Sequence, residues 1–371
     1  MRPTPPAPTL RWDLFCRVID NLGDAGVCWR LAADLAARGQ TVRLWIDEPA
    51  PLGHIAPAGA PGVQVIPWTS TPPVVEPGDA VVEAFGCDPP PAFVQAMAAQ
   101  RPAPAWVNLE YLSAEGYVER CHGLPSPQMA GPGRGLLKHF FYPGFTPHTG
   151  GLLREPGLIA ACEAFDRDAW LVQQGWARLP GEEVVTLFCY DNPALPALLQ
   201  ALAMGPPRLL LAAQGAASHQ VQRLLGAGLR SGSLRAVALP WLTQADFDRA
   251  LWCADLNFVR GEDSFVRAQW AGAPFVWQIY PQDDGAHVSK LQAFLDRFLA
   301  GAPARVAGPV TAVWRTWNGL APAGLAPALP RGRGWRTQAQ AWRGQLLAQD
   351  DLVTQLLAFV LAQSGRPAEA G

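Results

Sequence analysis

Apolar and polar positions along this chain follow two periods, which alternate in two successive series. Near the N-terminus an apolar run over residues 12–19 precedes residues 24–38, where apolar side chains recur at helical spacing, and a second apolar run covers residues 42–46. A short apolar run predicts a buried strand, and a 3.6-residue period predicts an amphipathic helix. The three segments together predict a βαβ unit of the doubly wound kind.

The first series continues beyond this unit. Apolar runs predict further strands at residues 63–67, 80–85 and 105–109, and a helical period predicts a helix near residues 92–100. Residues 121–160 are rich in glycine and proline, which predicts loops and a transition between two domains.

A second series of the same kind begins near residue 183. Its predicted strands cover residues 183–190, 208–212, 234–239 and 256–259, and its predicted helices cover residues 196–203, 219–225 and 245–253. Residues 335–363 are helical in pattern, with leucines on one face. We expect this C-terminal helix to cross back and pack against the first domain.

Two such series predict an α/β fold of two Rossmann-like domains that face each other across a cleft. The expected first domain covers residues 1–155 and is completed by the C-terminal helix at about 345–364, and the second covers residues 156–344. A length of 371 residues suits this division, because one domain usually holds about 150 residues.

Composition argues against several classes of partner. The net charge is −2 and the pI is near 6.3, with no long run of lysine or arginine, so we expect no nucleic-acid partner. No apolar run approaches the ~20 residues of a membrane span, and the proline-rich N-terminus lacks the apolar core of a signal peptide. We therefore expect a soluble, cytoplasmic protein without a membrane anchor.

Cysteine, histidine and glycine patterns predict no metal site and no resident cofactor. The seven cysteines are scattered without a CxxC pair, and the six histidines form no HxxxH pattern. Neither a GxSxG nucleophile motif nor a GxxxxGK[ST] phosphate loop occurs. The D-x-D matches at residues 166–168 and 246–248 lie at predicted helices, where helix capping or surface exposure explains them better than metal binding.

The turn after the first strand carries two carboxylates, Asp20 and Asp24, around Gly23 and Gly26. This is where a dinucleotide-binding loop belongs, but the G-x-G-x-x-G spacing is absent. Because two carboxylates repel a pyrophosphate, the turn favours a cationic or proton-donating ligand. The alternative is that Asp24 only caps the following helix.

A second polar turn, at residues 260–264, follows the apolar run over residues 256–259 and opens a helix. Asp263 or Ser264 is expected to cap that helix, whose exposed N–H groups suit a phosphate that Arg260 neutralises. Glu262 or Asp263 is then available for sugar hydroxyls. A capped helix with a solvated salt bridge remains the alternative.

Aromatic and amide residues follow other strands of the second series. Tyr280 and Gln282 come after the next strand, at the same carboxyl edge, where ligands of open α/β sheets bind. Phe188 and Tyr190 alternate along the strand at 183–190, so they share one face, which lines either a ligand site or the core. The alternative for Tyr280 is a purely structural role, as a partly buried aromatic residue whose hydroxyl is hydrogen-bonded.

Residues 12–33 and 257–282 together resemble the bacterial protein-arginine rhamnosyltransferases that modify elongation factor P. The resemblance extends from about residue 11 to residue 363. It implies a GT-B fold in which the first domain holds the acceptor and the second the nucleotide sugar. It also implies transfer of L-rhamnose from TDP-rhamnose, with inversion and without a metal, to one arginine of elongation factor P, which is thereby activated to rescue ribosomes stalled at polyproline.

The resemblance also implies roles for particular residues. Asp20 is expected to be the general base, and Asp24 to orient the acceptor guanidinium. A guanidinium, whose pKa exceeds about 12, needs carboxylates that hold it and take its proton. The donor-binding set is Gly23, Phe188, Tyr190, Arg260, Glu262, Asp263, Ser264, Tyr280 and Gln282.

Three other functions stay open at this point. The first is a GT-B glycosyltransferase with another donor or a small-molecule acceptor. The second is an NAD(P) oxidoreductase, which the missing glycine fingerprint disfavours. The third is a protein that binds elongation factor P without catalysis.

Overall fold

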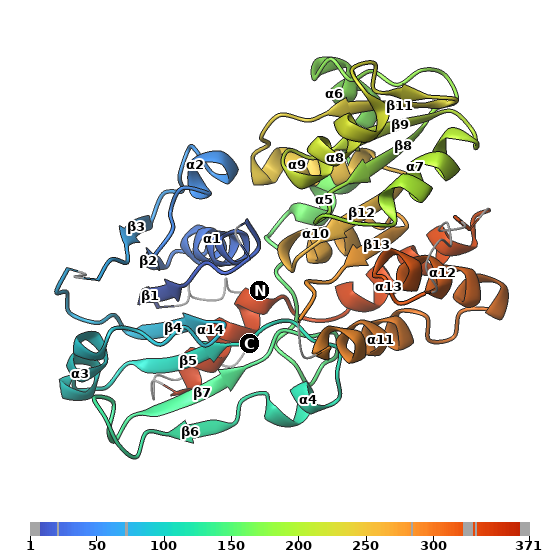
Figure 1. The fold of residues 1–371 in the computed structure, drawn as a ribbon. Coiled ribbons are helices and arrows are strands. Elements are labelled where there is room, and N and C mark those ends of the chain that lie inside the picture. The colour runs from blue at the N-terminus through green and yellow to red at the C-terminus, as the bar shows by residue number, and fades with distance from the viewer. Residues whose placement is uncertain are drawn as a thin grey trace, which may run out of the picture. The chain divides into compact units, whose positions relative to one another are not determined.

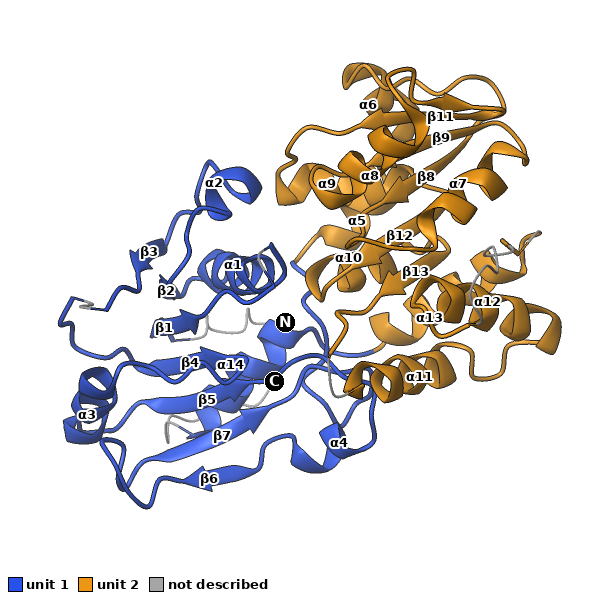
Figure 2. Ribbon diagram, in the orientation of Figure 1, with its two compact units in different colours: residues 1–155, 349–371 blue, residues 156–348 orange. Residues whose placement is uncertain are grey.

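The computed structural model describes residues 8–20, 22–70, 73–282, 285–321, 329–330 and 332–363 (Figure 1). The chain divides into two compact units (Figure 2). Unit 1 comprises residues 1–155 and 349–371, and unit 2 comprises residues 156–348. The cleft expected between the two units stays a prediction.

Unit 1 is built on a seven-stranded sheet in the order β3-β2-β1-β4-β5-β7-β6. The strands are β1 (Arg11–Cys16), β2 (Thr41–Ile46), β3 (Val63–Pro67), β4 (Ala80–Ala84), β5 (Ala105–Leu109), β6 (Pro125–Pro127) and β7 (Leu137–Phe141). All neighbours pair in parallel except β6 and β7. The central strand β1 is buried from Trp12 to Cys16, as expected for a parallel strand covered on both faces.

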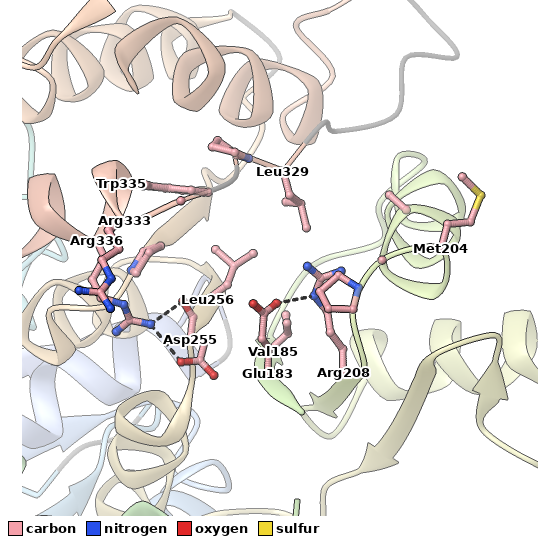
Figure 3. A pocket seen from close by; sticks show the side chains of 16 residues that line it. Glu183, Val185, Met204, Arg208, Asp255, Leu256, Leu329, Arg333, Trp335 and Arg336 are labelled. Carbon is pink, nitrogen blue, oxygen red and sulfur yellow. Dashed lines mark hydrogen bonds and ion pairs between the residues drawn. The ribbon is translucent and has the colours of Figure 1, made fainter. Parts of the chain in front are cut away.

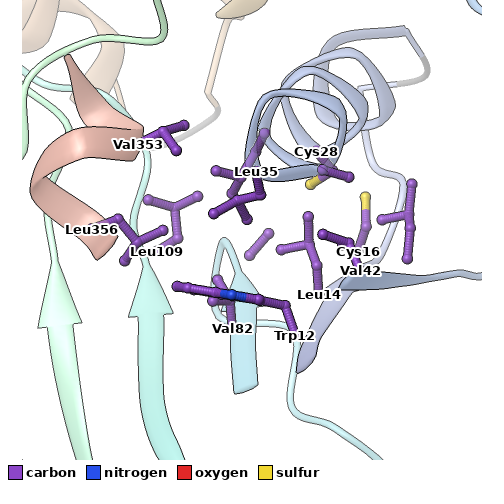
Figure 4. Packing of buried hydrophobic residues seen from close by; sticks show 14 of the residues in the cluster. Trp12, Leu14, Cys16, Cys28, Leu35, Val42, Val82, Leu109, Val353 and Leu356 are labelled. Atoms are coloured by element: carbon purple, nitrogen blue, oxygen red, sulfur yellow. The ribbon is translucent and has the colours of Figure 1, made fainter. Parts of the chain in front are cut away.

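The helices of unit 1 are α1 (Leu22–Ala37), α2 (Leu52–Ile55), α3 (Pro91–Ala99), α4 (Tyr117–Cys121) and α14 (Leu352–Gln363). Helix α14 places Val353 and Leu356 in the same apolar cluster as Trp12 and Leu35 (Figure 4). The prediction that the C-terminal helix returns to the first domain is therefore confirmed. The helical pattern over residues 335–363 is divided into two helices, and Asp351 begins the second by accepting the N–H of Thr354 at 2.9 Å.

Unit 2 is built on a six-stranded sheet in the order β10-β11-β9-β8-β12-β13. The strands are β8 (Glu183–Leu187), β9 (Arg208–Ala212), β10 (Arg230–Ser231), β11 (Leu234–Ala238), β12 (Leu256–Arg260) and β13 (Phe275–Gln278). The helices are α5 (Leu158–Glu163), α6 (Arg167–Gln173), α7 (Leu195–Ala203), α8 (Ala216–Leu225), α9 (Gln244–Cys253), α10 (Asp263–Ala271), α11 (Ala286–Phe298), α12 (Ala304–Trp317) and α13 (Gly334–Leu347). Only β10 pairs antiparallel with its neighbour.

The parallel cores of the two sheets share one strand order. In unit 1 the first strand, β1, lies between β2 and β4, and in unit 2 the first strand, β8, lies between β9 and β12. This is the Rossmann order, in which the chain winds outward in both directions from the first strand. Ligands of such sheets bind beyond the carboxyl ends of the strands, at the point where the winding reverses. That point lies beside β1 and β4 in unit 1 and beside β8 and β12 in unit 2.

Two predicted strands end three residues earlier in the structure than their apolar patterns do. β1 ends at Cys16, whereas residue 19 was expected, and β8 ends at Leu187, whereas residue 190 was expected. In both places side chains from other elements replace the β-ladder: Asp47 accepts the N–H of Val18 at 2.9 Å, and Gln278 accepts that of Tyr190 at 2.9 Å. The candidate residues Phe188 and Tyr190 lie in the second of these extensions, and Asp20 directly follows the first.

No helix in the described ranges is long and apolar enough to cross a membrane.

Candidate active site

Asp24 lies in the first turn of α1 and points back toward the loop that precedes the helix. Its side chain is 3% exposed, and its Oδ2 atom accepts the backbone N–H groups of Ile19 and Asp20, each at 2.8 Å. The alternative that Asp24 merely caps α1 is wrong, because these donors precede the helix and a cap would bond N–H groups within its first turn. Asp24 instead fixes the path of the backbone at Asp20.

Burial raises the pKa of Asp24 above its ordinary value, and the nearby Asp47 carboxylate raises it further. Three hydrogen bonds oppose this shift, because they favour the charged form: those from the N–H groups of Asp20 and Ile19, and one from the Tyr111 hydroxyl. The carboxylate is thus a buried acceptor whose hydrogen bonds compensate for lost hydration.

Gly23 provides the space that the Asp20 carboxylate occupies. A Cβ atom at Gly23 would lie 2.7 Å from Oδ2 of Asp20, which is closer than real Cβ contacts. The N–H of Gly23 also donates to the carbonyl of Asp20 at 2.6 Å. The half-buried Asp20 side chain therefore lies over the first turn of α1, where the positive end of the helix dipole favours a carboxylate.

Two aromatic residues that the sequence prediction missed lie at the same edge. Phe85 directly follows β4 and Tyr111 comes soon after β5, and their rings stack at 4.2 Å with an interplanar angle of 10°. Tyr111 is 38% exposed and donates its hydroxyl to Asp24. In the sequence these two residues are visible only as aromatics close to the ends of two predicted strands. The order β1-β4-β5 in the sheet is what brings them beside the Asp20–Asp24 turn.

In unit 2 the predicted residues Phe188, Tyr190, Arg260 and Tyr280 come together. The guanidinium carbon of Arg260 lies 4.6 Å from the centre of the Phe188 ring and 4.2 Å from that of Tyr190. Tyr190 meets Tyr280 edge-on at 5.4 Å and 81°. Aromatic faces hold a cation without neutralising it, so this arrangement keeps a positive charge available for an anion.

The loop between β12 and α10 is fixed by side chains of its own neighbourhood. The Ser264 hydroxyl donates to the carbonyl of Arg260 and accepts its N–H at 3.1 Å, and Trp277 Nε1 donates to the carbonyl of Gly261 at 2.7 Å. The prediction that Asp263 or Ser264 caps α10 is wrong. Glu262 occupies the N-cap position and makes no side-chain capping bond.

The described hydrogen bonds of Asp263 and Gln282, two further residues of the predicted donor-binding set, go to residues outside the group around Arg260. Asp263 accepts a hydrogen bond from Gln244 Nε2 at 3.3 Å, which adds Gln244, at the start of α9, to this edge. Trp241, 44% exposed, lies in the loop between β11 and α9. The exposed Gln282 donates its N–H to His287 Nδ1 at 3.1 Å, and no described contact joins it to Arg260 or Tyr280.

Both D-x-D matches have structural roles. Asp166 caps α6 by accepting the N–H groups of Asp168 and Ala169, as predicted. Asp248, by contrast, is buried and forms an ion pair with Arg267 at 2.7 Å. For this residue the predicted role, helix capping or surface exposure, is wrong. No cluster of three or more His, Cys, Asp or Glu residues suited to a metal ion occurs in the described ranges.

A cavity of about 970 Å³ lies at the opposite edge of the unit 2 sheet (Figure 3). Its lining includes Glu183 and Arg208, which begin β8 and β9, and their ion pair measures 3.0 Å. Arg336 and Asp255 form a second pair at 3.0 Å. These are the amino-terminal ends of the strands, so the cavity is separate from the edge that carries Arg260.

Comparison with solved structures defines the fold. A glycosyltransferase of kitacinnamycin is similar with a TM-score of 0.54 over 96% of this chain and 99% of that chain, at 14% identity. With two Rossmann-like units in one chain, the fold is GT-B, as the resemblance implied.

Closer relatives define the family. The family model described as Elongation-Factor P (EF-P) rhamnosyltransferase EarP matches residues 12–361. A protein-arginine rhamnosyltransferase from Pseudomonas aeruginosa is 45% identical over 94% of this chain and 98% of its own length. A structure described as the basis for EarP-mediated arginine glycosylation of translation elongation factor EF-P is 34% identical, with a TM-score of 0.67 over 95% of this chain and 98% of that chain. The chain belongs to the EarP family of protein-arginine rhamnosyltransferases.

Proposed function

We propose that this enzyme transfers L-rhamnose from TDP-β-L-rhamnose to the guanidinium of one arginine of translation elongation factor P, with inversion at the anomeric carbon. The observation that carries the proposal is the family match over residues 12–361, within which Asp20 and Asp24 form a paired-carboxylate turn in place of a dinucleotide loop. The arginine acceptor and the rhamnosyl group named in the relatives' descriptions support a guanidinium at one sheet edge and an activated sugar at the other.

The edge of unit 1 suits a guanidinium acceptor. Asp20 lies at the switch point of the sheet, and its carboxylate accepts the proton that leaves the attacking nitrogen. Asp24 orients the acceptor indirectly, because its carboxylate is engaged by the N–H groups of Ile19 and Asp20. The stacked Phe85 and Tyr111 rings provide an aromatic face on which a planar guanidinium can lie.

The edge of unit 2 suits the nucleotide diphosphate of the donor. Arg260 is held against the Phe188 and Tyr190 rings at the carboxyl end of β12. The amino end of α10, which follows directly, adds the positive potential of its helix dipole there. The diphosphate gains negative charge as it leaves, so these groups stabilise the transition state more than the ground state.

The proposed reaction is a single displacement. The guanidinium nitrogen attacks the anomeric carbon, the bond from that carbon to the β-phosphate oxygen breaks, and its electron pair leaves with TDP. The nitrogen loses its proton to Asp20. One displacement inverts the anomeric centre, and the reaction needs the two sheet edges to meet at that carbon. No resident cofactor or metal enters this scheme. As the sequence led us to expect, we propose that the enzyme acts in the cytoplasm.

The test is a transfer assay with purified components. The full chain, elongation factor P and TDP-rhamnose are incubated, and the acceptor is analysed by intact-mass and peptide mass spectrometry. A gain of one deoxyhexose on one arginine supports the proposal. No gain with TDP-rhamnose, but a gain with another nucleotide sugar or on another acceptor, would replace the proposed donor or acceptor.

A further inference from the structure

Tyr190 lies beyond the end of β8, where no neighbouring strand can satisfy its backbone. Two glutamine side chains do so instead. Gln278 Oε1 accepts the N–H of Tyr190 at 2.9 Å, and Gln220 Nε2 donates to the carbonyl of Tyr190 at 3.2 Å. Both glutamines are nearly buried, with 8% and 4% of their surface exposed, so these amide bonds are shielded from competing water.

Each glutamine is itself anchored to regular structure. Gln278 ends β13 and is the register partner of Arg260 on β12. Gln220 projects from α8, and its amide also donates to Ala216 and accepts the N–H of Asn192 at 3.0 Å. The backbone of Tyr190 is therefore held from two separate elements of unit 2.

A similar arrangement recurs two strands away, beyond β13 and next to Tyr280. Asn318, which follows α12, accepts the N–H of Ile279 at 3.0 Å and donates to the carbonyl of Trp277 at 2.8 Å. Side-chain amides thus fix the backbone beside both tyrosines of the edge-on pair. A ring held this way keeps its position against the Arg260 guanidinium.

We propose that Gln278 and Gln220 are positioning residues of the nucleotide-sugar site, which act on the donor through the Tyr190 ring and the Arg260 guanidinium stacked on it. This inference deepens the proposed function and rests on its donor being a nucleoside diphosphate sugar. The loss of either amide bond lets Tyr190 shift and leaves Arg260 without a fixed face, so the diphosphate meets a less preorganised cation.

The test measures binding of TDP to the full chain by calorimetry. In Gln278→Leu the leucine is close to glutamine in size but lacks the amide oxygen that accepts the N–H of Tyr190. The variant should bind TDP about tenfold more weakly, the effect expected for one lost buried hydrogen bond. The KM for TDP-rhamnose should rise while the KM for the acceptor protein stays unchanged. Gln220→Leu should show the same pattern, independently of whether the first variant folds well.

A matched control separates positioning from general stability. Gln338 of α13 also donates from its amide to a backbone carbonyl, that of Phe298 at 2.6 Å, and Gln338→Leu should leave TDP affinity unchanged. A double-mutant cycle then tests the route of the effect: in a Tyr190→Ala background, Gln278→Leu should cause no further loss. A Gln278→Leu variant that binds TDP as tightly as the wild type, or effects that add in the cycle, would overturn the inference alone. A wild-type chain that binds no TDP would overturn the proposed donor as well.

Discussion

The Oδ2 atom of Asp24 accepts the backbone N–H of Asp20 at 2.8 Å, so one carboxylate of the pair sets the position of the other. Asp24 is 3% exposed, whereas Asp20 is half-buried and lies over Gly23. The two carboxylates therefore have different tasks. Asp24 shapes the loop, and Asp20 is the one presented at the sheet edge.

Asp24→Asn tests this division. An amide oxygen still accepts an N–H, but without charge it binds two donors and the Tyr111 hydroxyl more weakly, so the loop loosens. We expect kcat to fall about 100-fold, a typical effect for a misplaced general base, with TDP affinity unchanged. Steady-state kinetics and calorimetry measure both quantities. A variant with normal kcat would show that the loop does not depend on this charge.

Gly23→Ala should separate stability from activity. Gly23 lies in the first turn of α1 without a positive φ, so alanine suits its backbone and gains up to about 1 kcal/mol of helix propensity. Its methyl group, however, takes the place of the Asp20 carboxylate. We expect kcat to fall at least about tenfold while the free energy of unfolding is unchanged or higher.

The control for Gly23→Ala is Gly344→Ala in α13, where no atom lies within 4 Å of an added Cβ. That variant should gain stability and keep its activity. Equal kcat values for Gly23→Ala and the wild type would mean that the Asp20 position observed here is not the working one.

Arg260→Ala should weaken TDP binding about 10- to 100-fold, because a charge-assisted bond to phosphate contributes about 1.5–3 kcal/mol. Arg260→Lys should recover only part of this, since an ammonium cannot stack flat between the Phe188 and Tyr190 rings. Calorimetry with TDP measures the series. The control is Arg249→Ala, which removes a guanidinium paired with Asp246, and an equal loss there would point to general electrostatics.

His139 should make unit 1 sensitive to acid. Burial against Phe359 of α14 lowers the pKa of His139 below 6.5, so the folded state holds the neutral ring and binds a proton less readily than the unfolded chain. Its contribution to stability is present above the unfolded pKa of about 6.5 and is lost as the pH falls through the lower folded pKa.

Urea unfolding at about pH 7.5 and pH 5.5 measures this effect for the wild type and for His139→Phe. The wild type should lose more stability between the two pH values than the variant does. An identical pH dependence in both proteins would assign the acid sensitivity to other groups.

Much of the fold follows from local patterns, whereas the site depends on contacts that are distant in sequence. The apolar runs and helical periods over residues 12–109 and 183–259 are enough to predict the two Rossmann-like units. The ends of β1 and β8 were misjudged because Val18 and Cys189 continue the apolar pattern while Asp47 and Gln278 replace the ladder. Capping of α10 was misjudged because Ser264 bonds back to Arg260.

The site residues, too, could be predicted only as far as local motifs allow. The resemblance placed Asp20, Asp24 and Arg260 by their motifs, and the structure sets the last of these against Phe188 and Tyr190 as a cation held by aromatic faces. Phe85 and Tyr111 were missed because their significance depends on β4 and β5 following β1 in the sheet, an order that no local pattern contains.

The central claim is that Asp20 takes the proton from an acceptor arginine while unit 2 holds TDP-rhamnose. The most direct measurement is the intact mass of elongation factor P after incubation with TDP-rhamnose and either the wild-type chain or Asp20→Asn, whose TDP affinity is checked to be normal. We predict a gain of one deoxyhexose with the wild type and, with the variant, a rate lower by a factor of at least about 100. Rhamnosylation by Asp20→Asn at the wild-type rate would contradict the account.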